Sequence, residues 1–305
     1  DDLFPSRKKG INAWITIMRG CDKFCTFCIV PFTRGRERSR SIDGIVNEIK
    51  NAVKDGFTEV TLLGQNVNSY NFDGHKFHVL LGNVARVPGL KRLRYTSPHP
   101  QDITIELLDI MARYDNICNS IHLPLQSGSD RILKRMNRTY TSGHFINIAR
   151  KIREILPSAG ISTDIIVGFP GESEKDFSDT INVMEKVNFD SAFTFKYSPR
   201  NGTKASGYED QINEDIKQKR LEQIISLQKS HTILRNQSYL GKIENVLIEK
   251  QSKRNIGKWA GRTDSNKWVI FDKDHASIKD IVPVLIMEAR GITLHGKIIN
   301  KAEAA

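Results

Sequence analysis

The fold is decided by the stretch Arg19-Gly-Cys-Asp-Lys-Phe-Cys-Thr-Phe-Cys-Ile29, in which three cysteines follow the spacing C-x3-C-x2-C. Cys21, Cys25 and Cys28 are three of the four cysteines in the chain, and they come directly after a predicted strand. Clustered thiols are typical of metal ligands, whereas a disulfide framework would scatter its cysteines. Three thiolates on one loop can bind three corners of an iron–sulfur cluster and leave one iron open to a small molecule.

A zinc site is the alternative for this loop, but zinc would need a fourth ligand nearby. The nearest histidines, His75 and His78, lie far along the chain. The fourth cysteine, Cys118, precedes an apolar segment, and we interpret it as a buried small hydrophobic residue. The loop is therefore expected to hold a cluster in which one iron has no cysteine ligand.

Outward from the loop, short apolar runs alternate with helical patterns from Asn12 to about Tyr239. This alternation predicts an α/β domain with a parallel sheet and right-handed crossovers. Six repeats fit a partial (β/α)6 barrel better than a closed eight-stranded one. Strands are expected at residues 13–18, 58–63, 93–96, 120–125, 162–167 and 192–197. Amphipathic helices are expected at residues 42–54, 103–113 and 177–187, and a long closing helix at residues 214–239.

After Gly241 the pattern becomes β-rich, with Gly and Asp turns. Strands are expected at residues 246–249, 258–263, 267–271, 281–289 and 291–299. Short strands at this spacing predict a small antiparallel barrel. We therefore expect a linker over residues 1–10, the α/β domain over 11–236, the small barrel over 237–300 and a tail over 301–305.

The 305 residues carry 46 Lys and Arg against 35 Asp and Glu, so the formal net charge is +11. This excess indicates a polyanionic partner or an acidic surface. No apolar run is long enough to span a bilayer, and residues 1–10 contain no signal peptide. We expect a cytoplasmic monomer that does not bind membranes.

The pattern C-x3-C-x-aromatic-C, with Phe27 as the aromatic residue, resembles the radical S-adenosylmethionine signature. Further segments resemble one branch of that superfamily, the methylthiotransferases: residues 31–40, 62–68, 97–100, 122–128, 168–172 and 197–203. The resemblance runs from Asn12 to Ile299, and the β-rich end is similar to the TRAM module, an RNA-binding domain. It implies a [4Fe–4S] cluster on the three cysteines, whose open iron binds S-adenosylmethionine. One electron would cleave this cofactor to methionine and a 5′-deoxyadenosyl radical.

Within the family, residues 33–38 and 64–70 are most similar to members that add a methylthio group to C2 of N6-isopentenyladenosine beside the tRNA anticodon. An aromatic C2–H bond is inert to side-chain bases, which explains the need for a radical. Sister enzymes that modify threonylcarbamoyladenosine of tRNA, or an aspartate of a ribosomal protein, are alternatives. An RNA-binding module with a structural cluster is an alternative of another class.

The resemblance also implies partners that this chain does not carry. The family has an amino-terminal domain with a second [4Fe–4S] cluster, implicated as the sulfur source, and the chain starts at Asp1 without it. We therefore expect radical formation and tRNA recognition here, and sulfur insertion only with that domain. The expected partners are the tRNA anticodon stem–loop and a reductant such as flavodoxin.

Ligands gather at the carboxyl ends of the strands in parallel barrels, and the resemblance places S-adenosylmethionine there. Gln65 and Asn66 are expected near its amino group, Gln126 and Ser127 near its ribose, and Arg138 near its carboxylate. The complete set of expected cofactor contacts is Phe27, Gln65, Asn66, Ser97, Gln126, Ser127, Arg138, Val167, Tyr197 and Ser198. No catalytic residue is assigned beyond the cluster cysteines.

Two groups of basic residues are expected to contact RNA. Directly behind the loop, alternate positions form a candidate phosphate-binding strip, for which a solvated basic face is the alternative: Arg34, Arg36, Arg38 and Arg40. In the small barrel, basic and aromatic residues interleave, which suits a single-stranded loop: Lys258, Trp259, Arg262, Lys267, Trp268 and Phe271. Either tryptophan could instead fill the barrel core. Three histidines without ligand spacing are interpreted as ordinary polar residues: His99, His122 and His275.

Overall fold

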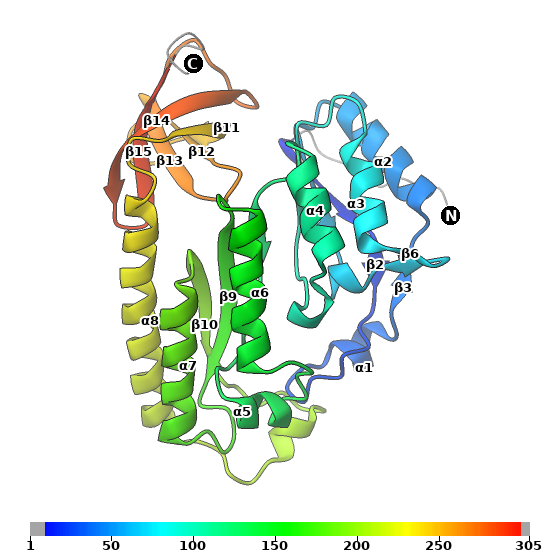
Figure 1. The fold of residues 1–305 in the computed structure, drawn as a ribbon, viewed down its shortest axis with the longest axis vertical. Coiled ribbons are helices and arrows are strands. Elements are labelled where there is room, and N and C mark those ends of the chain that lie inside the picture. Colours follow the sequence, from blue (N-terminus) through cyan, green and yellow to red (C-terminus); the bar gives the residue numbers. More distant parts are fainter. Residues whose placement is uncertain (1–9, 300–305) are drawn as a thin grey trace.

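The computed structural model of the chain describes residues 10–299. Figure 1 shows helices α2, α3 and α4 on one side of the first domain and α6, α7 and α8 on the other, with the second domain beyond the end of α8. The linker expected over residues 1–10 lies outside the described residues except for Gly10. The tail expected over residues 301–305 also lies outside them.

Six parallel strands, counted over residues 10–299, form the inner wall of the first domain, which we call the half-barrel. They are β1 (Asn12–Thr16), β4 (Glu59–Leu63), β7 (Arg92–Tyr95), β8 (Ser120–His122), β9 (Gly160–Val167) and β10 (Ser191–Lys196). They pair in the orders β1-β4-β7 and β8-β9-β10, and the two groups meet at a parallel bridge between Leu93 and Ile117. The predicted fold class, a partial barrel of alternating strands and helices, is confirmed.

Helices cover the outer surface of the half-barrel. They are α2 (Ile42–Lys54), α3 (Phe77–Ala85), α4 (Ile105–Arg113), α6 (Ser142–Ile155) and α7 (Glu174–Val187). The sequence pattern predicts α2, α4 and α7 but gives no prediction for α3 and α6. α6 begins after Thr141, whose hydroxyl accepts a hydrogen bond from the backbone amide of His144, as N-cap residues do.

Short elements occupy the connections. They are β2 (Met18–Arg19), α1 (Val30–Arg34), β3 (Arg38–Ser39), η1 (Val67–Ser69), β5 (Asn71–Phe72), β6 (His75–Lys76), η2 (Pro100–Asp102), α5 (Asp130–Arg135) and η3 (Lys204–Gly207). β2 and β3 pair in antiparallel fashion on either side of the cysteine loop and α1. This pairing brings the loop back to the end of β1.

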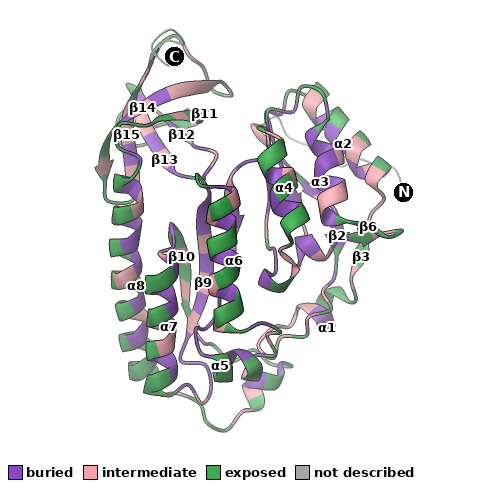
Figure 2. Ribbon diagram, viewed as in Figure 1, coloured by how far each residue is buried: buried purple, intermediate pink, exposed green. Residues whose placement is uncertain are grey.

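The main core lies between the strands and the helices that cover them. Alternate strand residues such as Ile15, Leu62, Ile121 and Ile165 are fully buried on the helix side. Figure 2 shows the same division, with buried residues on the helix faces that meet the strands. Since neighbouring residues of a strand point to opposite faces, the intervening residues line the concave inner side of the half-barrel.

The long helix α8 (Glu214–Gln237) packs along β10 through a polar face. Arg220 is buried and donates to Glu172 Oε1 at 2.8 Å, and Glu172 in turn accepts from the Gly168 amide. Ile225 and Leu234, which the pattern places on an apolar face, are 49% and 56% exposed. The helix prediction is confirmed, but charged and amide side chains supply much of its packing.

The second domain is a closed five-stranded barrel within the described residues, which we call the small barrel. Its strands are β11 (Ile243–Gln251), β12 (Lys258–Arg262), β13 (Trp268–Asp272), β14 (Ile281–Arg290) and β15 (Thr293–Ile298). The strand order is β11-β12-β13-β15-β14, and β13 pairs with β15 in parallel. The expectation of a purely antiparallel barrel is therefore wrong at this pair, because β15 inserts between β13 and β14.

Buried ionic contacts join the two domains. Arg92 of β7 donates to the backbone carbonyls of Arg262 and Asn245 at 2.7 and 2.6 Å, and lies 2.8 Å from Asp264 Oδ1. Its neighbour Arg94 donates to Glu59 Oε2 at 2.8 Å and to the Thr263 carbonyl at 2.9 Å. These contacts fix the turn between β12 and β13 against the amino ends of the half-barrel strands.

Candidate functional site

The cysteine loop lies at the carboxyl end of β1 and is held by its backbone. Cys21 donates its amide to the Gly35 carbonyl at 3.2 Å, and Thr26 donates to the Met136 carbonyl at 3.0 Å. Gly20 has a φ of +79°, and a Cβ there would lie 2.1 Å from the Arg36 carbonyl oxygen. Glycine is therefore required where the loop begins.

Cys21, Cys25 and Cys28 are free and half-buried. Burial raises the pKa of Cys21 to about 11 and also raises that of Cys28. Both thiols therefore hold their protons at neutral pH until a metal displaces them.

The donor set fits a cluster better than a single ion. Among residues 10–299, no three Cys, His, Asp or Glu side chains converge on one metal position. In a cubane each thiolate binds a different iron, so convergence on one point is not required. Arg138 Nη1 lies 3.4 Å from Cys25 Sγ, and this places a positive charge beside the thiolate that a cluster would create.

A cavity of about 340 Å³ opens beside Cys28. Five of the predicted site residues line it: Phe27, Cys28, Gln126, Tyr197 and Ser198. Its remaining walls come from Asp164, Ile166, Phe195, Lys196 and Arg200. The sequence prediction missed Asp164, which lies inside a strand outside the family-like segments, and Arg200, which lies in the family-like segment 197–203 but was not singled out.

Two buried polar atoms near the loop lack hydrogen-bond partners in the described part of the chain. They are the Tyr197 hydroxyl and Asn66 Oδ1. Asn66 Nδ2 donates to Asp102 Oδ2 at 3.0 Å, and Asp102 pairs with Lys23 of the loop at 2.8 Å. An unpartnered buried polar atom is costly, so both atoms are candidates to contact a bound cofactor.

Other predicted cofactor contacts lie at strand ends but do not line this cavity. Gln65 and Ser97 are exposed at the ends of β4 and β7. Ser127 is fully buried, with its hydroxyl 3.4 Å from Thr180 Oγ1 and accepting from the Ser129 amide. Val167 is buried and its carbonyl accepts from the Tyr197 amide. The positions of Ser127 and Val167 therefore favour support of the strand ends over direct contact.

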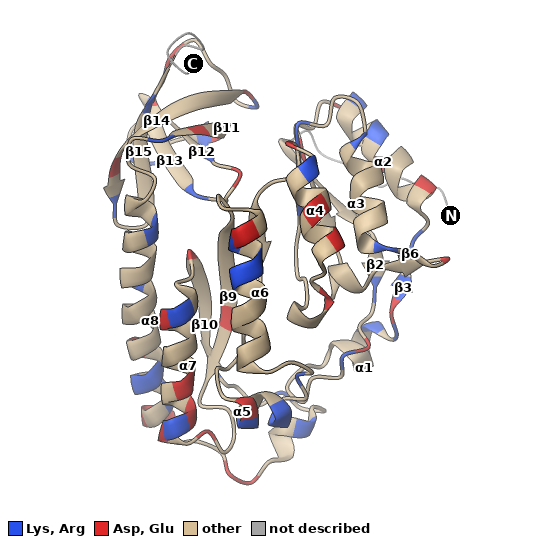
Figure 3. Cartoon of the chain, viewed as in Figure 1, with Lys and Arg blue, Asp and Glu red and all other residues tan. Residues whose placement is uncertain are grey.

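Basic residues follow one another along the segment from β2 to β3 (Figure 3). Arg34 and Arg38 are exposed and, over residues 10–299, have no ion-pair partner. Arg36 pairs with Asp22 at 2.6 Å. Arg19, which the sequence prediction missed, lies directly opposite Arg38 in the β2–β3 pair. Like charges in such positions repel each other unless an anion lies between them.

Arg40 differs from the other members of the predicted strip. Its guanidinium pairs with the buried Glu48 at 2.7 Å and donates to the Thr16 carbonyl at 2.5 Å. The interpretation of Arg40 as a phosphate contact stays a prediction, and its ion pair shows a second role for this residue, which is to hold the strand end against α2.

The basic residues of the small barrel also have different surroundings. Lys258 pairs with Asp272 at 3.1 Å and is partly exposed, and Arg262 donates to Glu249 while facing the Trp268 ring. Lys267 is buried, and its ammonium lies 2.9 Å from Asp190 of the half-barrel. Its interpretation as an RNA contact is corrected, since this ion pair belongs to the domain interface.

The aromatic residues of this barrel were expected either to stay accessible to RNA or to fill the barrel core, and both arrangements occur. Phe271 is buried in the barrel core, and Trp259 packs against this core while its indole donates to the Ala276 carbonyl. Trp268 is partly exposed, with Lys250 over its ring at 4.3 Å.

Two further side chains contradict or extend the sequence interpretation. His122, interpreted as an ordinary polar residue, lies 3.2 Å from Asp164 through Nε2 and 3.0 Å from Ser162 Oγ through Nδ1. Its partners lie on β9, so sequence spacing gives no signal of this pair. Cys118 is buried, and burial raises its pKa to about 12. Its thiol lies 3.8 Å from Asp264 at the domain interface, away from the cysteine loop.

A half-barrel of parallel strands with a three-cysteine loop after its first strand defines a class, the radical S-adenosylmethionine proteins, and the small closed barrel marks a second module. The chain matches the Radical SAM superfamily over residues 15–184 and the TRAM domain over residues 237–299, so the small barrel is called the TRAM barrel from this point on. It is 47% identical over 303 residues to the tRNA-2-methylthio-N(6)-dimethylallyladenosine synthase of Acetivibrio thermocellus, covering 98% of this chain and 63% of that protein. It is 45% identical to the protein of the same name from Carboxydothermus hydrogenoformans, covering 96% of this chain and 67% of that protein. The chain therefore belongs to the radical S-adenosylmethionine superfamily and, within it, to the family of these synthases.

Solved structures show the same fold at low identity. Coproporphyrinogen III oxidase from Escherichia coli superposes with a TM-score of 0.56 and 12% identity, covering 84% of this chain and 67% of that one. The methyltransferase TsrM from Kitasatospora setae gives a TM-score of 0.55 at 17% identity, covering 65% and 39%. Membership of the superfamily implies a [4Fe–4S] cluster and S-adenosylmethionine. Among the described helices, none has the length and apolar character needed to cross a membrane.

Proposed function

We propose that this chain is the radical-forming and RNA-binding part of a tRNA methylthiotransferase that modifies C2 of N6-isopentenyladenosine beside the anticodon. The chain spans about two thirds of the length of the curated relatives it matches, so the activity belongs to a longer protein. The observation that carries the proposal is the set of three half-buried thiols on one loop, of which Cys28 lines a cavity of about 340 Å³, in one chain with a TRAM domain.

The residues around the cavity have separate tasks in this proposal. Cys21, Cys25 and Cys28 would bind three irons, and the fourth iron would have no cysteine ligand. When bound, the cluster and S-adenosylmethionine supply one-electron cleavage that yields a 5′-deoxyadenosyl radical, which removes a hydrogen atom from the substrate. The Tyr197 hydroxyl and Asn66 Oδ1 would gain the partners that they lack.

The remaining polar and basic groups would position the ligands. Gln126 follows β8 in a left-handed backbone conformation, with a φ of +65°, and lines the cavity. Arg138 is fixed by the Tyr140 hydroxyl at 3.0 Å and would hold a carboxylate close to Cys25. Gln65 and Ser97, exposed at neighbouring strand ends, would contact the cofactor only from the open side.

RNA would be bound by two surfaces held at a fixed separation. The strip of Arg19, Arg34 and Arg38 lies next to the cysteine loop, and Lys258 and Arg262, which are partly exposed, belong to the TRAM barrel. Phosphate contacts position a nucleic acid and give salt-dependent affinity, while base contacts give specificity. The anticodon stem–loop fits such a pair of surfaces because it combines a helical stem with unstacked bases.

Sulfur insertion would need components outside this chain. We infer a second [4Fe–4S] cluster on a further domain of the longer protein, and a small electron-transfer protein such as flavodoxin as reductant. The protein would act as a monomer in the cytoplasm.

The test is nucleoside mass spectrometry of an anticodon stem–loop after anaerobic reaction with full-length, reconstituted protein. A stem–loop with N6-isopentenyladenosine should gain a methylthio group, and one with unmodified adenosine or threonylcarbamoyladenosine should not. The chain described here, reduced alone, should form 5′-deoxyadenosine but no methylthio product. Product on threonylcarbamoyladenosine would reassign the substrate, and absence of 5′-deoxyadenosine from every preparation would leave only a structural cluster.

A further inference from the structure

The concave inner side of the half-barrel exposes large aromatic side chains at its two edges. Trp14 of β1 is 56% exposed and Phe193 of β10 is 59% exposed. Ala13 and Ile15, the strand neighbours of Trp14, are buried on the helix side, which places Trp14 on the inner side. Such exposure within a concave wall is a signal of binding, because exposed apolar side chains gathered in one place mark interaction sites.

The two aromatic residues line one cavity of about 150 Å³. An engineered cavity of about this size in another protein binds a single benzene ring. The volume between Trp14 and Phe193 is therefore suited to one flat ring system and is too small for a folded segment of chain.

The polar walls of this cavity hold Phe193 in place and join it to the cofactor site. His122 contacts the edge of the Phe193 ring, with 5.8 Å between ring centroids. His122 in turn pairs with Asp164, and Asp164 also lines the larger cavity beside Cys28. A ring bound between the aromatics would thus lie next to the space where the cofactor is expected.

Residues of the TRAM barrel also line this cavity. Asn266 and Arg262, from the turn between β12 and β13 and its flank, line it together with Arg94 of β7. Docking of the TRAM barrel therefore completes the cavity. This continuity favours a nucleic-acid base over a free small molecule as its occupant.

We propose that Trp14 and Phe193 form a stacking site for one unstacked purine base of the RNA substrate. The His122–Asp164 pair would set the distance between this base and the cofactor cavity. The inference rests on the proposed function for the identity of the base. A base must leave its stack before an enzyme can act on one of its ring atoms, and aromatic side chains compensate for the lost stacking.

The experiment measures the dissociation constant of full-length protein for two anticodon stem–loops. One carries the target purine, and the other has an abasic site at that position. Wild-type protein should bind the intact stem–loop more tightly. In Trp14→Ala and in Phe193→Ala, the dissociation constant for the intact stem–loop should rise about 5- to 150-fold, while that for the abasic one stays constant.

Three controls separate stacking from folding. Trp14→Phe and Phe193→Tyr keep a ring and should restore most of the discrimination. Leu234→Ala removes a side chain of equal exposure, 56%, from α8 and should change neither constant. Leu234→Ala should also leave the formation of 5′-deoxyadenosine without RNA unchanged, since Leu234 lies outside the cysteine loop and does not line the cavity beside Cys28.

The outcomes for the site and for the function are distinguishable. Equal binding of the intact and abasic stem–loops by wild-type protein, or equal weakening of both by Trp14→Ala, would overturn the stacking site even if methylthio product forms. Discrimination that depends on Trp14 and Phe193 without any methylthio product would support the site and refute the proposed function.

Discussion

Replacing Arg92 with alanine removes the side chain that joins β7 to the TRAM barrel, and we expect it to loosen the domain interface. Arg92 is 2% exposed and makes three charge-assisted contacts, to Arg262 O, Asn245 O and Asp264 Oδ1. Each hydrogen bond of this kind contributes about 1.5–3 kcal/mol, and such values do not add fully. The Asp264 carboxylate is 37% exposed and can be hydrated when Arg92 is lost, so the cost comes mainly from the two backbone carbonyls left without a donor, and we take about 3 kcal/mol as the expected loss for the interface.

This loss should appear in the docking of the TRAM barrel more than in the core of either domain. Hydrogen exchange of β11 and β12 amides reports local opening, and a loss of about 3 kcal/mol corresponds to roughly a 100-fold fall in protection. Affinity for tRNA should also fall, because two RNA-binding surfaces act together only at a fixed separation. Formation of 5′-deoxyadenosine without RNA should be unchanged, since the cysteine loop lies at the opposite ends of the strands.

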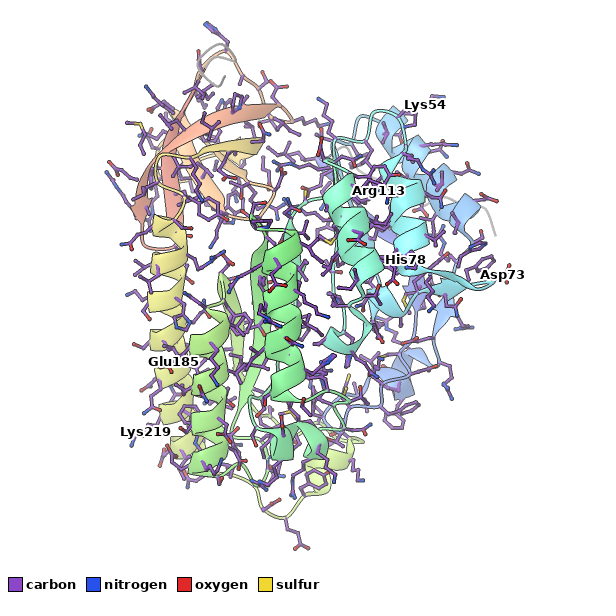
Figure 4. The ribbon with its side chains drawn as sticks, viewed as in Figure 1. Lys54, Asp73, His78, Arg113, Glu185 and Lys219 are labelled. Carbon is purple, nitrogen blue, oxygen red and sulfur yellow. The ribbon has the colours of Figure 1, made fainter. Side chains whose placement is uncertain are left out.

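Arg113→Ala is the matched control. Arg113 is exposed and ends α4 on the outside of the molecule (Figure 4), so its loss should change the free energy of unfolding by less than about 0.5 kcal/mol. If Arg92→Ala costs no more than this control and the exchange of β11 and β12 is unaltered, then the contacts of Arg92 do not fix the interface and the reasoning fails.

Three other outcomes are expected. Replacing any of the three loop cysteines with alanine should abolish the iron content and visible absorbance of the reconstituted chain. Cys118→Ala should retain both. Loss of iron from the Cys118→Ala variant would show that the assigned ligand set is wrong. Arg38→Glu should weaken tRNA binding and lower the slope of log affinity against log salt concentration by about 0.7 to 0.9. Lys54→Glu, on the outer end of α2, should change neither quantity. Equal effects of the two substitutions would mean that only the net charge of the protein matters. Burial raises the pKa of Glu244 from 4.5 to about 7, and the charge of Asp264 adds to this effect. Between these two pH values the folded state binds more protons than the unfolded state. The free energy of unfolding therefore falls as the pH rises from about 4.5 to about 7. Glu244→Gln should therefore increase the free energy of unfolding by about 1–3 kcal/mol at about pH 8 and leave it nearly unchanged below pH 4.5. Urea unfolding at both pH values measures the difference. An equal gain in stability at both pH values would rule out titration of Glu244 as the cause.

The strands and the cysteine loop could be predicted from the sequence because their signals are local. Alternation of apolar runs gives the six strands, and cysteine spacing needs no information from elsewhere in the chain. The signal for helix α6 is equally local, because Phe145, Ile148 and Ile152 recur at helical spacing and are buried on one face, so the sequence analysis missed a helix that could have been predicted. The parallel pairing of β13 with β15 could not be predicted, since strand spacing does not determine strand order.

The ion-pair partners of the basic residues could not be predicted from the sequence. Lys267 pairs with Asp190 from another domain, and even Arg40, whose partner Glu48 lies nearby on α2, shows no sign of this pair in the sequence. A basic residue that binds RNA and one that neutralises a buried carboxylate look the same in a sequence. For the same reason His122 gave no signal, because Asp164 lies on the next strand of the half-barrel.

The insertion of β15 between β13 and β14 has a consequence for biosynthesis. Strands β11 to β14 leave the ribosome before β15, and until residues 293–298 emerge, β13 and β14 each present an unpaired edge. Unpaired strand edges are templates for association with other chains, so this interval is the one in which a nascent chain is most exposed to aggregation. Translation that stops between β14 and β15 releases an open barrel, whereas a few residues more close it.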